Sequence, residues 1–198
     1  MKMSNNKNNN NNRNNIFKKY INSNSNFCTY THTYNKNKSN SKSKIYYEPI
    51  ISYINNPFVE IDQINDKIFL GNYEAAKDHK ILKSRNITHI LICGINLKEH
   101  FKNDFVYMRI PVLDNSNEQI KNYFNQAIEF IDNSNKIFIH CQAGISRSPT
   151  IVIAYLMWKY KLQMKNAMKL VISKRKVISP NDGFLKQLKN YEAELMNN

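Results

Sequence analysis

An apolar strand that runs directly into a short loop and then into an apolar helix is the feature that most constrains the fold of this chain. Residues 136–140 have the character of a buried strand, and residues 148–160 that of a buried helix. The loop between them holds Cys141 and Arg147, separated by five residues. A loop in this position can direct successive backbone N–H groups to one side, and the positive end of the following helix adds to them. The segment therefore predicts a cradle for a phosphate group.

The residue types in the loop suit such a cradle. Gly144 permits a backbone conformation that a side chain would penalise, and Pro149 lies in the first helical turn, where its missing N–H costs little. The surrounding donors should favour the thiolate of Cys141, which would make it a nucleophile at neutral pH. The planar guanidinium of Arg147 could bind two phosphoryl oxygens at once, which a lysine could not do well.

Two serines and a histidine complete the segment. We expect Ser146 and Ser148 to donate hydrogen bonds to the sulfur, and His140 to orient the loop by hydrogen bonding rather than to titrate. The alternative is that the cysteine is a small buried apolar residue and the arginine a surface cation, because the bare spacing often arises by chance. The strand before the loop and the helix after it favour phosphate binding.

Cleavage of a phosphate ester also requires a proton for the leaving oxygen, because an alkoxide leaves poorly. Asp114 is the candidate donor, since it lies after a predicted strand and before a predicted helix, where a loop could bring it over the cradle. The same group could then act as a base towards water. A loop aspartate alone is more often a helix cap, but the cysteine motif reverses that preference.

From about residue 61 the chain alternates apolar runs with turn and cap residues in a β/α rhythm, which predicts a mixed α/β domain. Besides the strand at 136–140, we expect strands at 67–70, 88–93 and 105–110. We expect helices at 74–84, from Asn117 through Ile131, and at 148–160, 163–175 and 182–196.

The first 60 residues differ in composition. Residues 4–15 are almost entirely asparagine and offer little apolar surface to offset the entropy of ordering. We therefore expect a disordered tail rich in Asn, Lys and Ser over 1–44, a linker over 45–60 and a folded domain over 61–198. A docking motif around Lys42, Lys44 and Ile45 is the alternative to a plain linker.

The formal net charge is +14, from 29 basic and 15 acidic residues. Residues 1–60 hold 9 of the basic and 2 of the acidic residues, so the excess is divided equally between this segment and the rest. Such an excess favours anionic partners, including phosphorylated proteins, nucleic acid and acidic membranes. A solvated, lysine-rich surface is the simpler explanation of most of it.

No apolar run reaches the roughly 18 to 20 residues that cross a bilayer, and the polar N-terminus is unlike a signal peptide. The three cysteines, Cys28, Cys93 and Cys141, are too few and too widely spaced for a disulfide scaffold or a zinc cluster. We therefore expect a soluble protein in a reducing compartment, the cytoplasm, with the nucleus as an alternative.

Three segments together resemble the dual-specificity phosphatases of the cysteine-based protein tyrosine phosphatase superfamily. They are His-Cys-Gln-Ala-Gly-Ile-Ser-Arg-Ser at 140–148, Ile-Pro-Val-Leu-Asp at 110–114 and Ser-Pro-Asn-Asp-Gly-Phe at 179–184. The resemblance covers about residues 61–198. It implies an α/β fold with a central, mostly parallel sheet flanked by helices. It also implies hydrolysis of phosphotyrosine and of phosphoserine or phosphothreonine in proteins, through a phosphocysteine intermediate.

The resemblance also implies roles for single residues. Cys141 would be the nucleophile, Arg147 the phosphate binder and Asp114 the general acid. Asn181 would be a buried amide that braces the catalytic loops, although a cap on the last helix is an equal alternative. The other phosphate-binding positions would be Gln142, Ala143, Gly144, Ile145 and Ser146, with His140 and Ser148 in support.

The family implies no metal and no organic cofactor. Its partners are phosphorylated proteins, with a protein kinase as one candidate, and we expect a monomer without membrane insertion or nucleic-acid binding. Residues 1–60 are too short and polar for the rhodanese-like domain of the mitogen-activated kinase phosphatases. The chain also lacks the phosphotyrosine-recognition loop of the larger tyrosine-specific enzymes, so a shallow pocket should admit phosphoserine and phosphothreonine.

Two rival functions remain open at this point. The first is another substrate, a phosphoinositide or the 5′ end of RNA, which a basic surface would attract. The uncharged residues Gln142, Ala143 and Ile145 argue against it, because phosphoinositide phosphatases place cations in this loop. The second is a catalytically silent module that binds phosphoproteins. Such modules typically lose the cysteine or the arginine, and both are present here.

Cys93 ends a predicted strand in the same way that Cys141 follows one. If the two strands are parallel neighbours, as in the family, both cysteines lie at one edge of the sheet, where a disulfide is geometrically feasible. An oxidised Cys141 could then be trapped as a reversible disulfide with Cys93. The alternative, which we favour, is that Cys93 is a small buried apolar residue.

Overall fold

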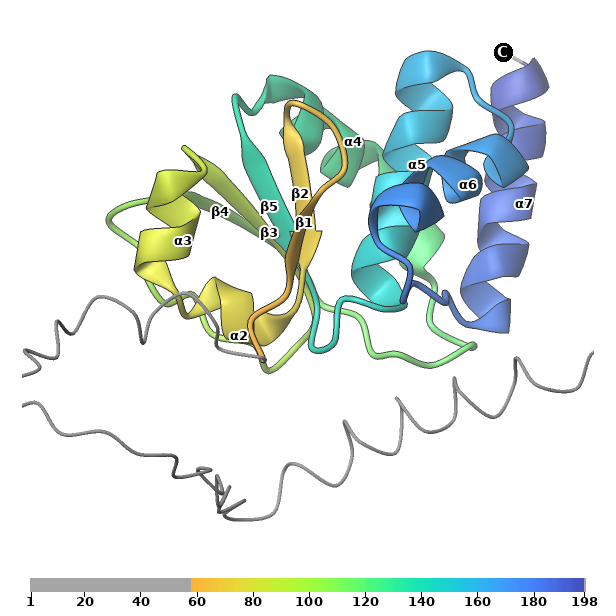
Figure 1. The fold of residues 1–198 in the computed structure, drawn as a ribbon. Coiled ribbons are helices and arrows are strands. Elements are labelled where there is room, and N and C mark those ends of the chain that lie inside the picture. The colour runs from red at the N-terminus through yellow and green to blue at the C-terminus, as the bar shows by residue number, and fades with distance from the viewer. Residues whose placement is uncertain (1–57, 198) are drawn as a thin grey trace, which may run out of the picture. The chain divides into compact units, whose positions relative to one another are not determined.

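The computed structural model describes residues 58–197. The predicted tail at 1–44 and most of the predicted linker at 45–60 lie outside these residues. Figure 1 shows a central sheet with helices on both faces, which confirms the predicted α/β fold. Its strands are β1 (Ile61–Gln63), β2 (Ile68–Gly71), β3 (His89–Cys93), β4 (Val106–Ile110) and β5 (Ile137–His140).

The sheet has the strand order β1-β2-β5-β3-β4, and every pairing is parallel except that of β1 with β2. Because β2, β5, β3 and β4 run in the same direction, their carboxyl ends meet at one edge of the sheet. The loops that follow these strands are therefore brought together there, and they include the cysteine loop after β5.

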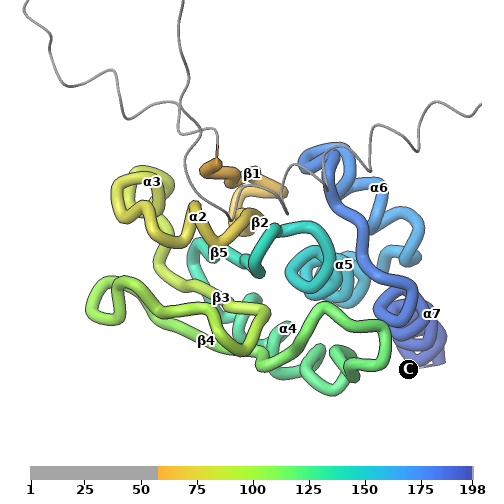
Figure 2. The backbone as a smooth tube through the Cα atoms, turned by 90° about the horizontal axis from the view of Figure 1, so that it is seen from below, coloured from red at the N-terminus to blue at the C-terminus, as the bar shows by residue number. Residues whose placement is uncertain are grey.

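Two helices lie against one face of the sheet, and two others lie against the opposite face with two more packed outside them (Figure 1; Figure 2). The first pair is α2 (Tyr73–Ala76) and α3 (His79–Ser84). The second set is α4 (Phe124–Asn133), preceded by the 3₁₀ helix η2 (Ile120–Tyr123), α5 (Arg147–Tyr160), α6 (Met164–Lys174) and α7 (Asp182–Asn197).

The strands contribute side chains to a separate core on each face. On β5, Ile137 and Ile139 pack into the larger core with α4–α7, whereas Phe138 packs into the smaller core with α2 and α3. This alternation follows from the two-residue period of a strand, and burial on both faces explains why β5 is apolar from Ile137 to Ile139. Helix α5 is buried from Ser148 to Met157, as expected for a helix that is apolar on all sides.

Two predicted boundaries were wrong, each because of local polar groups. The helix predicted at 74–84 is two helices, since Asp78 Oδ1 accepts a hydrogen bond from Ile81 N at 3.0 Å and caps α3 separately. The helix predicted from Asn117 starts three residues later as η2, because Asn117 N donates instead to Asn115 Oδ1 at 2.9 Å in a turn. The short edge strand β1 was not predicted.

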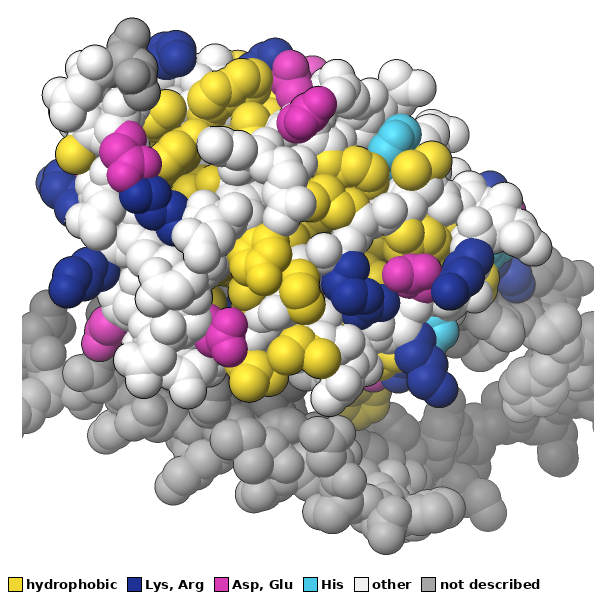
Figure 3. Space-filling view, turned by 180° about the vertical axis from the view of Figure 1, so that it is seen from behind, with side chains coloured by type: hydrophobic (Ala, Val, Ile, Leu, Met, Phe, Trp, Pro, Cys, Tyr) yellow, Lys and Arg dark blue, Asp and Glu magenta, His cyan; other side chains and the backbone are white. Residues whose placement is uncertain are grey.

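On the face seen in Figure 3, lysine and arginine side chains lie among aspartate and glutamate side chains and apolar ones, without a continuous field of one sign. No helix within residues 58–197 is both long and apolar enough to cross a membrane.

Candidate active site

The loop from β5 to α5 forms the predicted cradle around Cys141, whose side chain is buried. Its sulfur accepts hydrogen bonds from Gly144 N at 3.2 Å and from Ser148 Oγ at 3.3 Å. Gly144 has φ of 66°, a conformation that strains any residue with a side chain, so its predicted role is confirmed. Two donors therefore converge on the sulfur from the loop and from the first turn of α5.

Arg147 begins α5 and turns its guanidinium back towards the loop after β3. A Cβ atom on Gly94 would lie 3.0 Å from Arg147 Nη1, so the arginine rests against a bare backbone. Arg147 Nε is buried and has no hydrogen-bond partner among the described residues, and it lies 3.9 Å from Asp114 Oδ2. An unpaired buried N–H is costly unless an acceptor satisfies it, and a phosphoryl oxygen would do so.

Asp114 is held at the rim of the cradle by neutral donors. Its Oδ1 accepts hydrogen bonds from Ser146 Oγ at 2.6 Å and from Asn181 Nδ2 at 3.0 Å. The expectation that Ser146 donates to the sulfur was therefore wrong, because its hydroxyl proton is directed at Asp114. Ser146 Oγ in turn accepts from Asn181 N at 3.2 Å, so three segments that are distant in sequence meet here.

Asn181 fulfils both of the roles that the sequence left open. Its Nδ2 braces Asp114, and its Oδ1 accepts from Phe184 N at 2.9 Å, which caps α7. It is half-buried rather than buried, because it lies at the rim of the site.

His140 is fully buried next to Cys141. Its Nδ1 donates to the carbonyl of Cys141 at 3.3 Å, and its ring stacks on Phe138 and Tyr73. Burial lowers the pKa of His140 from its usual 6.5 to about 4, in spite of the hydrogen bond to the carbonyl, which favours the charged form. The imidazole is therefore neutral at physiological pH, as expected for an orienting role.

Cys93 lies at the same edge of the sheet as Cys141, as the parallel arrangement predicted. Strands β3 and β5 are neighbours with Ile92 opposite His140, and the residue after each of these two is a cysteine. Both cysteines are free and buried, and Cys93 belongs to the larger core. Burial, and then the neighbouring Cys141, raise the pKa of the Cys93 thiol well above its ordinary value.

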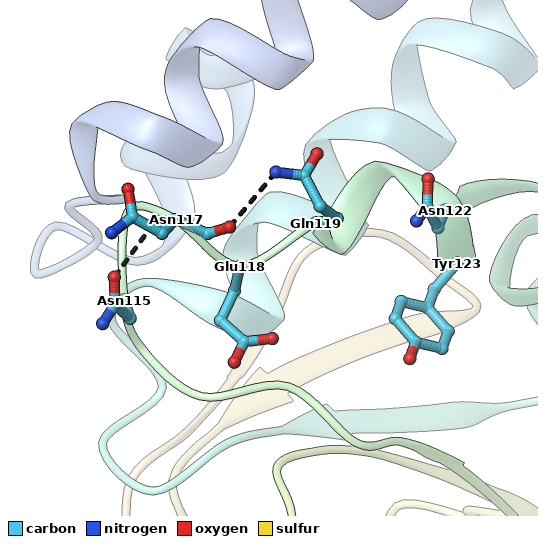
Figure 4. Close-up of a pocket in the computed structure, with 6 residues that line it drawn as sticks. All are labelled: Asn115, Asn117, Glu118, Gln119, Asn122 and Tyr123. Carbon is cyan, nitrogen blue, oxygen red and sulfur yellow. Dashed lines mark hydrogen bonds between the residues drawn. The ribbon is translucent and has the colours of Figure 1, made fainter.

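Helix α7 supports the loop that carries Asp114, which the sequence did not reveal. A Cβ on Gly183 would lie 1.9 Å from the carbonyl oxygen of Ser116, so the helix backbone presses directly on the loop. Gln187 accepts from Lys121 N at 3.0 Å and donates to the carbonyl of Glu118 at 2.8 Å. Beside this contact lies a shallow hollow of about 320 Å³, lined by Asn115, Asn117, Glu118, Gln119, Asn122 and Tyr123 (Figure 4).

A cysteine at the base of a strand–loop–helix cradle, with an arginine and an aspartate at its rim, is the arrangement typical of cysteine-dependent phosphatases. Residues 68–194 match the family model described as dual specificity phosphatase, catalytic domain. The chain belongs to the dual-specificity phosphatase family and is a protein phosphatase of the cysteine-based protein tyrosine phosphatase superfamily.

Relatives of known name agree with this assignment. Dual specificity protein phosphatase 1 of Arabidopsis thaliana is 39% identical over 136 residues, which are 67% of this chain and 69% of the relative. Dual specificity protein phosphatase 1B of the same plant is 38% identical over 143 residues, 70% of this chain and 86% of the relative. The crystal structure of human tyrosine phosphatase-like serine/threonine/tyrosine-interacting protein has a TM-score of 0.66 at 37% identity, covering 69% of this chain and 97% of that one.

Loss of the acid should be felt most where the leaving group is poor. We predict that Asp114→Asn lowers kcat on phosphothreonine peptide by about 10² to 10⁴ and removes the fall in rate at high pH. An aryl phosphate whose phenol has a low pKa should be much less affected, because its leaving oxygen needs no proton. Steady-state kinetics on both substrates across pH test this, and equal losses on the two would exclude Asp114 as the acid.

The buried His140 should make stability depend on pH. Because the folded state holds the imidazole neutral down to about pH 4, the unfolded state takes up a proton first, and stability falls as pH drops from about 6.5 towards 4. The loss should reach about 3 kcal/mol, measured by urea unfolding. His140→Asn should remove this contribution, whereas a change at the partly exposed His79, His79→Gln, should leave it. An unchanged pH slope in His140→Asn would contradict the assignment.

The pairing of the two cysteines stays a prediction that oxidation can test. Mild peroxide should inactivate the enzyme reversibly, with activity restored by thiol reductant, and mass spectrometry should find a Cys93–Cys141 linked peptide. Cys93→Ser should recover poorly, because the oxidised nucleophile has no partner to protect it from further oxidation. Recovery of Cys93→Ser as complete as that of the parent would refute the idea.

Proposed function

We propose that Cys141, Arg147 and Asp114 hydrolyse phosphorylated side chains in two steps, as nucleophile, phosphate clamp and general acid. The observation that carries this proposal is the convergence on one point of a sulfur with two hydrogen-bond donors, an unpaired buried Arg147 Nε and a carboxylate at the rim. The remaining cradle residues Gln142, Ala143, Gly144, Ile145 and Ser146 bind the phosphoryl oxygens through their backbone N–H groups.

In the first step, the thiolate of Cys141 attacks phosphorus, and the bond from phosphorus to the substrate oxygen breaks. Protonated Asp114 gives its proton to that oxygen, which leaves as an alcohol or phenol. Arg147 and the inward N–H groups stabilise the charge on the equatorial oxygens, where it is greatest in the transition state.

In the second step, water attacks the phosphocysteine. Asp114, now ionised, removes the proton from that water, and the phosphorus–sulfur bond breaks. The hydroxyl of Ser148 donates to the sulfur at 3.3 Å and stabilises the thiolate as it leaves. Inorganic phosphate is released, and the enzyme returns to its starting protonation state.

We also propose a substrate range of phosphotyrosine and phosphoserine or phosphothreonine in proteins, including a protein kinase as a candidate partner. The shallow setting of the site supports this range: Asp114 and its neighbour Leu113 are about half exposed.

The proposal further includes that the protein is a monomer, that it resides in the cytoplasm or nucleus, and that it does not bind nucleic acid. We place the start of the catalytic domain no later than Phe58, because Asn72 Nδ2 donates to its carbonyl at 2.7 Å.

A phosphate-binding module without turnover is the second candidate function. The name of one similar protein supports it. The human relative in the comparison is named a tyrosine phosphatase-like, serine/threonine/tyrosine-interacting protein. The closeness of Cys141, Arg147 and Asp114 in this chain favours catalysis instead, since binding alone needs neither a nucleophile nor an acid.

The full chain should hydrolyse an aryl phosphate at full rate in the presence of a chelator, because Arg147 and the backbone supply the positive charge. Cys141→Ser should abolish turnover while phosphate binding persists, since a neutral alcohol is a poor nucleophile in the same cradle. Phosphate release and phosphate binding by calorimetry measure the two properties separately. Turnover that disappears with chelator would contradict the mechanism. Phosphate binding without turnover in the parent protein would favour the phosphate-binding module.

A direct comparison of phosphorylated substrates tests the proposed substrate class. Equal amounts of a phosphotyrosine peptide, a phosphothreonine peptide, an inositol phospholipid and a 5′-triphosphorylated RNA should give appreciable phosphate release from the two peptides alone. The Cys141→Ser protein, immobilised, should then retain its phosphoprotein from an extract of the source cells. A lipid or RNA rate above the peptide rates would replace the proposed substrate class.

A further inference from the structure

Arg175 is a buried cation that has no role in the proposed catalytic steps. It follows α6 directly, and its side chain is 2% exposed. Its two neighbours, Lys174 and Lys176, are exposed. Burying a guanidinium costs free energy unless its donors and its charge are satisfied. The groups around Arg175 should therefore explain its burial.

Four acceptors surround the guanidinium. Two are carboxylates: Nη2 donates to Glu60 Oε2 at 2.7 Å, and Nη1 donates to Asp62 Oδ2 at 2.7 Å. The other two are carbonyls of the phosphate cradle, Gly144 O at 2.9 Å from Nε and Ala143 O at 3.2 Å from Nη2. The planar fork of an arginine fits such a set, and a lysine ammonium would not.

The bonds to the carbonyls determine where the neighbouring N–H groups point. In a trans peptide, the C=O of one residue and the N–H of the next point in opposite directions. With the carbonyl of Ala143 drawn outward to Arg175, the N–H of Gly144 must point inward, and it does donate to Cys141 Sγ at 3.2 Å. By the same geometry, the outward carbonyl of Gly144 turns the N–H of Ile145 inward.

The adjoining peptides are held in the same way by backbone groups. Tyr73 N donates to the carbonyl of Gln142 at 3.1 Å, and Ser179 N donates to that of Ile145 at 2.7 Å. Arg175 therefore supplies the only side chain among the described residues that holds the two central peptides of the cradle from outside.

The carboxylates that hold Arg175 come from the edge of the sheet. Asp62 lies in β1 opposite Leu70 of β2, and Glu60 immediately precedes the strand. Both precede the residues matched by the family model, which begin at 68. Strand β1 and the residue before it thus contribute two anions to a site whose proposed catalytic residues lie far along the chain.

We propose that Arg175, supported by Glu60 and Asp62, is a positioning residue that orients the phosphate cradle. It sets the affinity for phosphate and the reactivity of the Cys141 thiolate without touching the substrate. This inference rests on the proposed function of the cradle. The competing explanation is purely structural, in which Arg175 only ties the end of α6 to β1.

The test compares full-chain variants that differ at one cation. Arg175→Met removes the fork and the charge, Arg175→Lys keeps the charge, and Lys174→Met and Lys176→Met are matched controls at the exposed neighbours. For each, circular dichroism and thermal melting report folding. Calorimetry with inorganic phosphate measures the affinity of the cradle for phosphate. The pH dependence of iodoacetamide alkylation measures the reactivity of Cys141.

We expect both Arg175 variants, where folded, to bind phosphate about 10- to 100-fold more weakly, the scale of one or two lost charge-assisted hydrogen bonds. Alkylation of Cys141 should shift to higher pH, because the Gly144 N–H no longer favours the thiolate. The two lysine controls should match the parent. A purely structural role would lower the melting temperature and leave phosphate affinity and the alkylation profile of the folded protein unchanged, which would overturn the proposal.

If the Arg175 variants do not fold, the double change Glu60→Gln with Asp62→Asn distinguishes the two explanations. It keeps the arginine and removes the two carboxylates that bind it. Weaker phosphate binding in that variant supports the proposal, and parent-like binding overturns it. The phosphate and alkylation measurements need no turnover. A parent that binds phosphate but hydrolyses no ester would therefore refute the proposed function while still testing Arg175.

Discussion

A loop can bind a phosphate through its backbone only if its N–H groups turn inward, and this requires each of its carbonyls to find a partner outside. For the carbonyls of residues 142–145 the partners are backbone N–H groups at Tyr73 and Ser179 and the buried guanidinium of Arg175. They come from α2, from the segment before α7 and from the end of α6. The orientation of one loop thus depends on the packing of elements on both faces of the sheet.

The parallel sheet makes this convergence possible. Since β2, β5 and β3 end at the same edge, the backbone after each strand contributes to the site. Gly71 ends β2, and its carbonyl oxygen would lie 2.4 Å from a Cβ on Gly144. Gly94 follows β3 and lies against the guanidinium of Arg147. Both contacts are close because no side chain intervenes, and they leave the cradle little freedom to rearrange.

The sequence revealed the parts of the site that are local. Cys141, Gly144 and Arg147 share one strand–loop–helix segment, and the parallel strands placed Cys93 correctly. It did not reveal partners whose role depends on tertiary contacts: Arg175 reaches residues more than 110 positions earlier in the chain, and no spacing rule connects them. Ser146 was assigned to the wrong acceptor for the same reason, because Asp114 comes within its reach only in the folded protein. The edge strand β1 was missed because three residues show too little alternation.

In the proposed mechanism Asp114 acts first as an acid and then as a base, and its contacts hold it in place for both roles. Its Oδ1 accepts only from neutral donors, a hydroxyl and an amide, and these bonds persist whether or not the carboxyl group carries its proton. The other oxygen, Oδ2, lies 3.9 Å from Arg147 Nε, which is longer than a tight ion pair. Holding Oδ1 with neutral groups fixes the position of the carboxyl group at the rim of the cradle, which the proposed mechanism requires in both of its steps.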